Sequence, residues 1–147
     1  MAEQRPYGAT LRWTEGMQFV ATAGGSNHAI VLDGNPEVGG ADTGMRPMEA
    51  LLCALGSCTA MDVISVLQKK RLDVRAFEVR LAGQRAEEHP KRYTHITLTF
   101  VVTGHGIPES AVERAIELSQ TKYCGATASL NAEITYTFRV EEEGEDA

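Results

Sequence analysis

Residues 47–71 read PMEALLCALGSCTAMDVISVLQKKR, and the rest of the chain must fold around this stretch. It predicts one helix of about 24 residues, roughly 36 Å long at 1.5 Å per residue. Pro47 suits the first helical turn, Glu49 lies near the positive end of the helix dipole, and Lys69–Arg71 close the negative end. Between these signals the segment is apolar almost all round. We therefore expect a central helix that is buried on several sides.

Cys58 lies in the middle of this segment, directly after a Gly-Ser pair. One interpretation is packing, because free cysteine is among the most buried residue types. The other is a reactive thiol that acts together with Cys124, which ends a second helical segment. Spacing alone does not show that the two sulfurs meet. Cys53 is five residues before Cys58, points to another face of the helix and is interpreted as a core residue.

Composition limits the class of protein. The 147 residues predict a single domain, residues 1–147, with enough chain to bury a core. A net charge of -6 argues against a nucleic-acid partner, which would require a basic face. No apolar run of about 18 residues is free of charges and no signal-peptide core is present, so we expect a cytoplasmic protein without a membrane partner. Three cysteines in a reducing compartment are packing or redox-active residues.

Alternating and helical patterns divide the chain into eight elements. We predict strands at 9–14, 17–23, 28–32, 72–84, 93–103 and 132–140, and helices at 47–71 and 108–123. The second helix should bury a stripe that ends on Tyr123, with Gly125 as its C-terminal stop. A short additional helical turn is expected at residues 126–130. Residues 1–7 are expected to be a loose N-terminus, and the acidic residues 141–147 a disordered tail.

Strands grouped in hairpins with helices between them indicate an α+β fold with antiparallel sheets around the long buried helix. One sheet from a chain of this length hardly covers a helix that is apolar all round. The pattern therefore favours a homodimer in which two copies share one core.

The thiol chemistry sets requirements on the surroundings of Cys58. A thiol reacts as its thiolate, so an enzyme must supply positive charge or hydrogen-bond donors. The helix dipole acts only within the first turn, and Cys58 lies about three turns into the helix. Asp62, four residues later, would raise the pKa of the thiol. Of the four histidines only His28, beside the Gly-Gly turn, is kept as a possible site residue, and no spacing predicts a metal site.

The segment MEALLCALGSCTAMDVISVLQKKR, followed some fifty residues later by LSQTKYC, resembles the OsmC-like family, which includes OsmC and the organic hydroperoxide resistance (Ohr) proteins. LGSCTAMDVISVLQKKR and HITLTFVVTG are most similar to the YhfA-like branch of this family. The resemblance extends from the first strand to about Val140. It implies an OsmC-like α+β fold that forms an intertwined homodimer, with two active sites at the subunit interface.

The resemblance also implies roles for the cysteines. Cys58 would attack the peroxide and become a sulfenic acid, and Cys124 would resolve it to a disulfide that an external dithiol reduces, with no metal or organic cofactor. Catalytic relatives activate the first thiol with an arginine on the strand before the entry loop and a glutamate at the start of the helix. Here the strand His28–Leu32 has no arginine, which leaves Arg46 and Glu49 as possible supporting residues.

Two functions are therefore expected. The first is a thiol-dependent reductase of small organic or lipid hydroperoxides, in oxidative-stress defence. The alternative is a non-catalytic dimeric binding protein for a small hydrophobic or acyl ligand, in which the cysteines sense the redox state.

Overall fold

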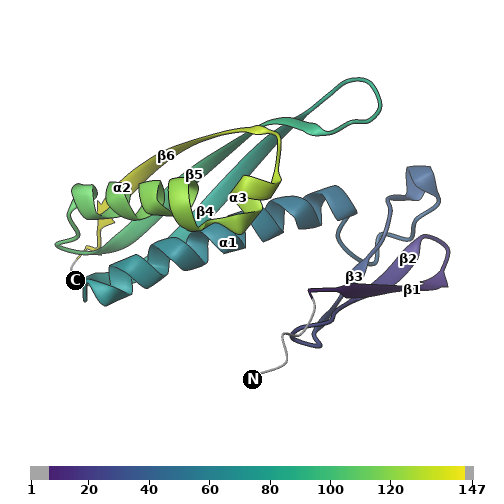
Figure 1. The fold of residues 1–147 in the computed structure, drawn as a ribbon, viewed down its shortest axis with the longest axis horizontal. Coiled ribbons are helices and arrows are strands. Elements are labelled where there is room, and N and C mark those ends of the chain that lie inside the picture. Colours follow the sequence, from purple (N-terminus) through teal and green to yellow (C-terminus); the bar gives the residue numbers. More distant parts are fainter. Residues whose placement is uncertain (1–6, 145–147) are drawn as a thin grey trace. The chain divides into compact units, whose positions relative to one another are not determined.

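In the computed structural model, which describes residues 7–144, the alternating N-terminal segment forms the predicted three-stranded meander. Its strands are β1 (Ala9–Glu15), β2 (Gln18–Ala23) and β3 (Ala29–Leu32), antiparallel in the order β1-β2-β3. They belong to the first of two units into which the chain divides, residues 1–51 and 52–147 (Figure 1). All of β1 is exposed and β2 is only half-buried, so this unit has almost no core of its own.

The loop after β3 is organised by one buried carboxylate. Asp33 accepts hydrogen bonds from the backbone N–H of Gly34 (2.7 Å), of Ala41 (3.3 Å) and of Thr43 (3.1 Å), and from the Thr43 hydroxyl (2.5 Å). The Thr43 hydroxyl in particular, together with these backbone donors, holds the pKa of Asp33 below its ordinary value against the effect of burial. Gly40 allows the loop to close, since a Cβ there would lie 1.9 Å from the Gly34 oxygen.

The long helix α1 (Pro47–Lys69) begins at the predicted residue, but it buries one stripe only. The stripe consists of Leu55, Gly56, Thr59, Val63 and Leu67. On the opposite side Cys53, Ala54, Ser57 and Met61 are exposed. The prediction of burial on several sides is therefore wrong for the single chain. α1 is long and apolar enough to cross a membrane, but the core helix of a globular domain meets the same criterion of length and composition.

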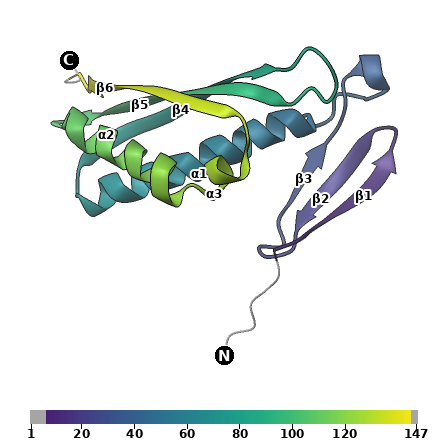
Figure 2. The ribbon, with the colours of Figure 1, turned by 45° about the horizontal axis from the view of Figure 1, so that its top comes forward.

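The second sheet combines β4 (Asp73–Arg85), β5 (Tyr93–His105) and β6 (Glu133–Glu142) in the order β4-β5-β6. β4 and β5 form the predicted antiparallel hairpin, but β6 runs parallel to β5, so the expectation of purely antiparallel sheets is wrong here. The reason is the crossover through α2 (Glu109–Leu118) and α3 (Gly125–Ser129), which returns the chain to the end where β5 starts. α1 and α2 lie along the same face of this sheet (Figure 2).

The core of the second unit is centred on β5, whose inward side chains are completely buried. They are Ile96, Leu98, Phe100 and Val102. Phe100 stacks on Phe77 of β4 at 6.5 Å and meets Tyr136 of β6 edge-on at 6.2 Å. Gly56 lets α1 approach the sheet, because a Cβ at this position would lie 2.6 Å from Leu81 Cδ1.

The acidic C-terminal segment is more ordered than the sequence predicts. β6 continues through Glu142 because its ladder with β5 extends as far as Gly104. His105 lies between two carboxylates, with Nδ1 3.5 Å from Glu142 and Nε2 2.9 Å from Glu143. Tyr7, the first described residue, is exposed. The rest of the two predicted termini, residues 1–6 and 145–147, lies outside the described residues.

We predict that Asp33→Asn loosens the entry loop, because an amide cannot accept as strongly from all four donors. Backbone amides of Ala41 and Thr43 should exchange with solvent faster in the variant, as measured by NMR, and Glu37→Gln in the same loop serves as the exposed control. Folding lowers the pKa of Asp33, so its ionised carboxylate stabilises the folded state at pH values above the ordinary pKa of 3.8. This stabilisation is lost as the pH falls through the lowered pKa. Unchanged exchange in Asp33→Asn would contradict this role.

Candidate functional site

The two cysteines from distant parts of the sequence meet in the second unit. Cys58 is half-buried on α1, and Cys124 is 4% exposed at the junction between the end of α2 and α3. The two side chains are close enough to act on each other's pKa, and both are free thiols. The structure therefore places a reduced dithiol pair where the sequence left two interpretations open.

A π-helical turn directs Cys124 inward. Helix α2 continues into Ser119–Tyr123 with i→i+5 geometry, and the Cys124 N–H donates to the Ser119 oxygen at 2.8 Å. In a regular α-helix the residue four positions after buried Ser119 would face the core, which is why the sequence predicted Tyr123 there. The wider turn moves the inward position one residue on, so Tyr123 is 53% exposed and Cys124 is buried.

The chain after Cys124 forms the short helical turn predicted at residues 126–130, one residue earlier than expected. Gly125 does not stop the preceding helix but begins α3, and Cys124 is the N-cap residue of this short helix. Its sulfur accepts a hydrogen bond from the Thr127 N–H at 3.4 Å. The extended backbone at Cys124, with φ -75° and ψ 101°, separates the two helical segments and points the thiol at α1.

Side chains that the sequence analysis did not single out complete the surroundings of Cys124. The fully buried Thr59 places its Oγ1 3.3 Å from the Cys124 sulfur. Gln120 Nε2 donates to Thr59 Oγ1 at 3.2 Å, and Thr127 Oγ1 donates to Gln120 Oε1 at 3.4 Å. One signal in the sequence could have revealed this network. Thr59 is a polar residue in an otherwise apolar row, four positions from Leu55 and from Val63, and a buried polar side chain requires a hydrogen-bond partner.

The surroundings of Cys58 contain one donor and one carboxylate. The Ala126 backbone N–H donates to the Cys58 sulfur and acts to lower its pKa. The pKa of Cys58 is nevertheless raised, because this donor is outweighed by burial, by the neighbouring Cys124 and by the charge of Asp62. Asp62 accepts a hydrogen bond from Ser119 Oγ at 2.8 Å and still acts on the thiol, as the sequence spacing predicted.

Cys124 has the opposite balance. Its burial acts to raise the pKa, but the hydrogen bonds from Thr127, Thr59 and Cys58 hold the pKa below the ordinary thiol value. The more acidic thiol of the pair is therefore Cys124. Cys53, interpreted as core, is exposed on the outer side of α1 instead, because the sheet covers the opposite face of this helix.

The three possible supporting residues lie in the first unit. Arg46 forms an ion pair with Asp42, which raises the pKa of its guanidinium, and its backbone N–H donates to Glu49 Oε2 at 3.0 Å. His28 is exposed in the turn before β3. Arg46 and Glu49 are thus neighbours of one another, at the start of α1. Among the described residues, no group of three histidine, cysteine or acidic side chains has the arrangement of a metal site.

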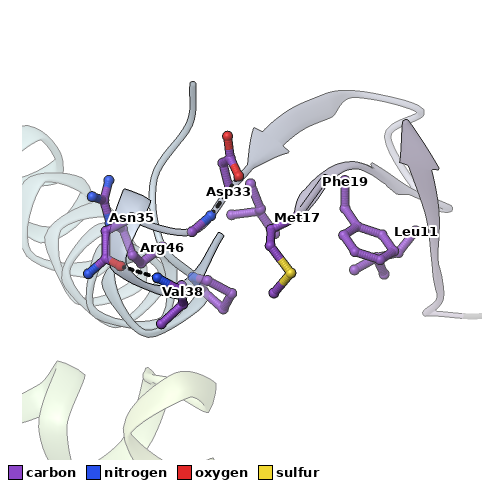
Figure 3. Close-up of a pocket in the computed structure, with 10 residues that line it drawn as sticks. Leu11, Met17, Phe19, Asp33, Asn35, Val38 and Arg46 are labelled. Carbon is purple, nitrogen blue, oxygen red and sulfur yellow. Dashed lines mark hydrogen bonds between the residues drawn. The ribbon is translucent and has the colours of Figure 1, made fainter. Parts of the chain in front are cut away.

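The first unit also contains an apolar cavity of about 310 Å³ (Figure 3). It is lined by Leu11, Met17, Phe19, Leu32, Asp33, Gly34, Asn35, Val38, Arg46 and Pro47. Figure 3 shows Leu11 and Phe19 on one side of Met17, with Asn35, Val38 and Arg46 on the other. Its lining is apolar apart from Asp33, Asn35 and Arg46, which suits a hydrophobic ligand or an apolar side chain.

Known proteins resemble this chain over most of its length. Residues 39–139 match the family described as OsmC-like protein. The protein YhfA of Escherichia coli K12 is 42% identical over 133 residues, which cover 90% of this chain and 96% of YhfA. A hypothetical protein of Aquifex aeolicus has a crystal structure with a TM-score of 0.83 and 30% identity, over 96% of this chain and 100% of that one.

A more distant structure shares the fold alone. The organic hydroperoxide resistance protein of Elizabethkingia anophelis is 14% identical, with a TM-score of 0.62 over 97% of this chain and 100% of its own. The predicted resemblance to the YhfA-like branch is confirmed by the 42% identity to YhfA. With a family match over residues 39–139 and relatives of this identity, the chain belongs to the OsmC-like protein family.

Proposed function

We propose that this protein is a thiol-dependent hydroperoxide reductase in which Cys58 is oxidised and Cys124 resolves it. The observation that carries the proposal is the closeness of the two free thiols, which act on each other's pKa although they lie 66 positions apart in the sequence. Two thiols in contact form a disulfide without a large movement of the backbone. Cys58 is the more exposed of the two and is therefore the sulfur that a peroxide reaches first.

The reaction balances without a cofactor. The Cys58 sulfur attacks the peroxide ROOH, the O–O bond breaks, and the products are a Cys58 sulfenic acid and the alcohol ROH. Cys124 then attacks the sulfenic sulfur, and water leaves as the disulfide forms. An external dithiol, in a reducing cytoplasm, returns the pair to the reduced state and is itself oxidised to a disulfide.

The relatives support this chemistry at the level of the family. The Elizabethkingia protein is an organic hydroperoxide resistance protein, and it shares the fold of this chain. Small organic or lipid hydroperoxides are therefore the proposed substrates. The alternative, a dimeric protein that binds a hydrophobic or acyl ligand and senses redox state through the cysteines, is favoured by the apolar cavity of the first unit.

We further propose that the active form is a homodimer. The exposed stripe of α1 carries Cys53, Ala54, Ser57 and Met61, without a charged side chain. The first unit likewise exposes Leu11, Trp13 and Ile30 on a sheet with almost no core. Apolar area of this kind on a single chain marks an interface, and a second copy offers the same surfaces for burial.

The first prediction concerns the two cysteines. Wild type treated with cumene hydroperoxide should form a Cys58–Cys124 disulfide, measured by stopped-flow kinetics and peptide mass spectrometry. Cys58→Ser should abolish peroxide consumption, and Cys124→Ser should accumulate a sulfenic acid that dimedone traps. Cys53→Ser is the matched control and should react like wild type. If wild type and Cys58→Ser consume peroxide at the same slow rate, the reductase proposal fails, and native mass spectrometry for a co-purified hydrophobic ligand tests the alternative.

The second prediction concerns Asp62. Asp62→Asn removes the charge that raises the pKa of Cys58 and keeps an oxygen that accepts from Ser119. For each unit by which the pKa of Cys58 falls, the thiolate fraction rises about tenfold and the rate about threefold, since nucleophilicity falls with pKa. The pH profile of peroxide oxidation should shift to lower pH. A profile identical to wild type would show that this carboxylate does not act on the reacting thiol.

The third prediction concerns assembly. Met61→Glu places a charge in the middle of the exposed apolar stripe and should shift the protein from dimer to monomer, as measured by sedimentation equilibrium. Gln68→Glu, exposed near the polar end of α1, should remain dimeric. A wild-type protein that sediments as a monomer of 15.9 kDa at micromolar concentration would exclude the proposed homodimer.

A further inference from the structure

A directed series of hydrogen bonds ends on the Cys124 sulfur. Thr127 Oγ1 donates to the Gln120 oxygen, and the Gln120 Nε2 donates to Thr59 Oγ1. Thr59 Oγ1 lies 3.3 Å from the Cys124 sulfur and either atom can donate, so with Cys124 ionised the Thr59 hydroxyl donates to it while its oxygen accepts from Gln120. The Thr127 N–H donates to the same sulfur at 3.4 Å. Cys124 is therefore surrounded by donors, an arrangement that suits an anion.

We propose that Cys124, and not Cys58, carries the negative charge of the reduced pair, and that Thr59, oriented by Gln120, is the positioning residue that keeps it there. Cys124 then acts as the base that removes the proton of Cys58. This inference rests on the proposed reductase function and adds to it the source of thiol activation.

The directions of the two pKa shifts agree with this geometry. Burial alone would raise the pKa of Cys124, yet the hydrogen bonds bring it below the ordinary value. For Cys58 the Ala126 N–H acts to lower the pKa, but burial, the neighbouring Cys124 and the charge of Asp62 together raise it. In the π-helical turn Ser119–Tyr123, the charged Lys122 lies over the Tyr123 ring, 5.2 Å from its centroid. The anion is thus held mainly by neutral donors.

The proton can be followed through each step. As the Cys58 sulfur attacks the peroxide, its proton passes to the Cys124 thiolate and from there to the leaving alkoxide, which becomes the alcohol. The restored Cys124 thiolate then attacks the sulfenic sulfur, and the hydroxide that leaves takes a proton from solvent. The Ala126 N–H stabilises the Cys58 sulfur while it is unprotonated.

The same polarity directs the reduction. A thiolate of the external dithiol attacks the more exposed Cys58 sulfur, the disulfide bond breaks, and Cys124 leaves with the electron pair. The thiol of lower pKa leaves faster, so the mixed disulfide forms on Cys58. The second thiol of the reductant then attacks its own sulfur in this mixed disulfide, and Cys58 leaves and takes up a proton.

The experiment measures the pKa of each cysteine separately and needs no peroxide. In Cys53→Ser protein with carbon-13-labelled cysteine, the Cβ chemical shifts of Cys58 and Cys124 are followed against pH by NMR. Cys124 should titrate below the ordinary thiol value and Cys58 above it. Thr59→Val, which keeps the shape of the side chain, should raise the pKa of Cys124 by about one unit, the effect of one hydrogen bond to a charged group.

Matched variants separate positioning from structure. Thr59→Ser keeps the hydroxyl and should titrate like the parent, and Gln120→Leu should raise the pKa of Cys124 without touching Thr59. Thr121→Val removes an exposed hydroxyl from the same turn, one that donates to the Glu117 oxygen, and should change neither pKa. Thr59→Val should also slow the oxidation of Cys58 by cumene hydroperoxide at neutral pH.

The possible outcomes distinguish this inference from the proposed function. If Cys124 titrates at or above the ordinary thiol value, or if Thr59→Val leaves its pKa unchanged, the inference is overturned even when peroxide is consumed. If Cys124 titrates low in a Thr59-dependent way but peroxide is not consumed, the charge assignment holds and the reductase proposal fails.

Discussion

Thr59 joins the two parts of the chain that carry the cysteines, and the arrangement of the site depends on its hydrogen bonds. It lies at the centre of the buried stripe of α1, between Leu55 and Val63, with no exposure to solvent. The apolar residues of the stripe pack α1 against the sheet, but this packing would tolerate a small slide or rotation of the helix. A buried hydroxyl does not, because leaving it unpaired costs about 1–3 kcal/mol. Its contacts with Cys124 and Gln120 therefore fix the position of α1 relative to the end of α2.

The π-turn at Ser119–Tyr123 solves a related problem of rotation. A regular helix would have directed Tyr123 at α1 and left Cys124 on the outer side. Inserting one residue into the last turn turns the following backbone, so the thiol faces Cys58 while the preceding side chains keep their places in the core. The weaker backbone hydrogen bonding of such a turn is a cost that recurs at functional sites. Here it brings the Cys124 sulfur to 3.3 Å from Thr59 Oγ1 on α1, beside Cys58.

The electrostatics of the pair depend on neutral groups. The described groups that can donate to Cys124 are the Thr59 hydroxyl and the Thr127 backbone N–H. Neutral donors stabilise a thiolate over short distances only, so the charge stays on one sulfur and the other keeps its proton. This division gives the two cysteines different roles although they have the same chemistry. It also makes the position of the proton, rather than the presence of a cation, the feature on which the proposed reactivity depends.

Local patterns in the amino-acid sequence were enough to predict most elements of the fold and the two candidate thiols. The alternation of strands, the start of α1 at Pro47 and the family motifs around Cys58 and Cys124 all lie within short stretches of the chain. Three features became visible only in the folded chain: the parallel pairing of β6, the inward turn of Cys124 and the Thr59–Gln120–Thr127 network. Each depends on residues far apart in the sequence, and a single extra residue in one helical turn changes which side chains meet.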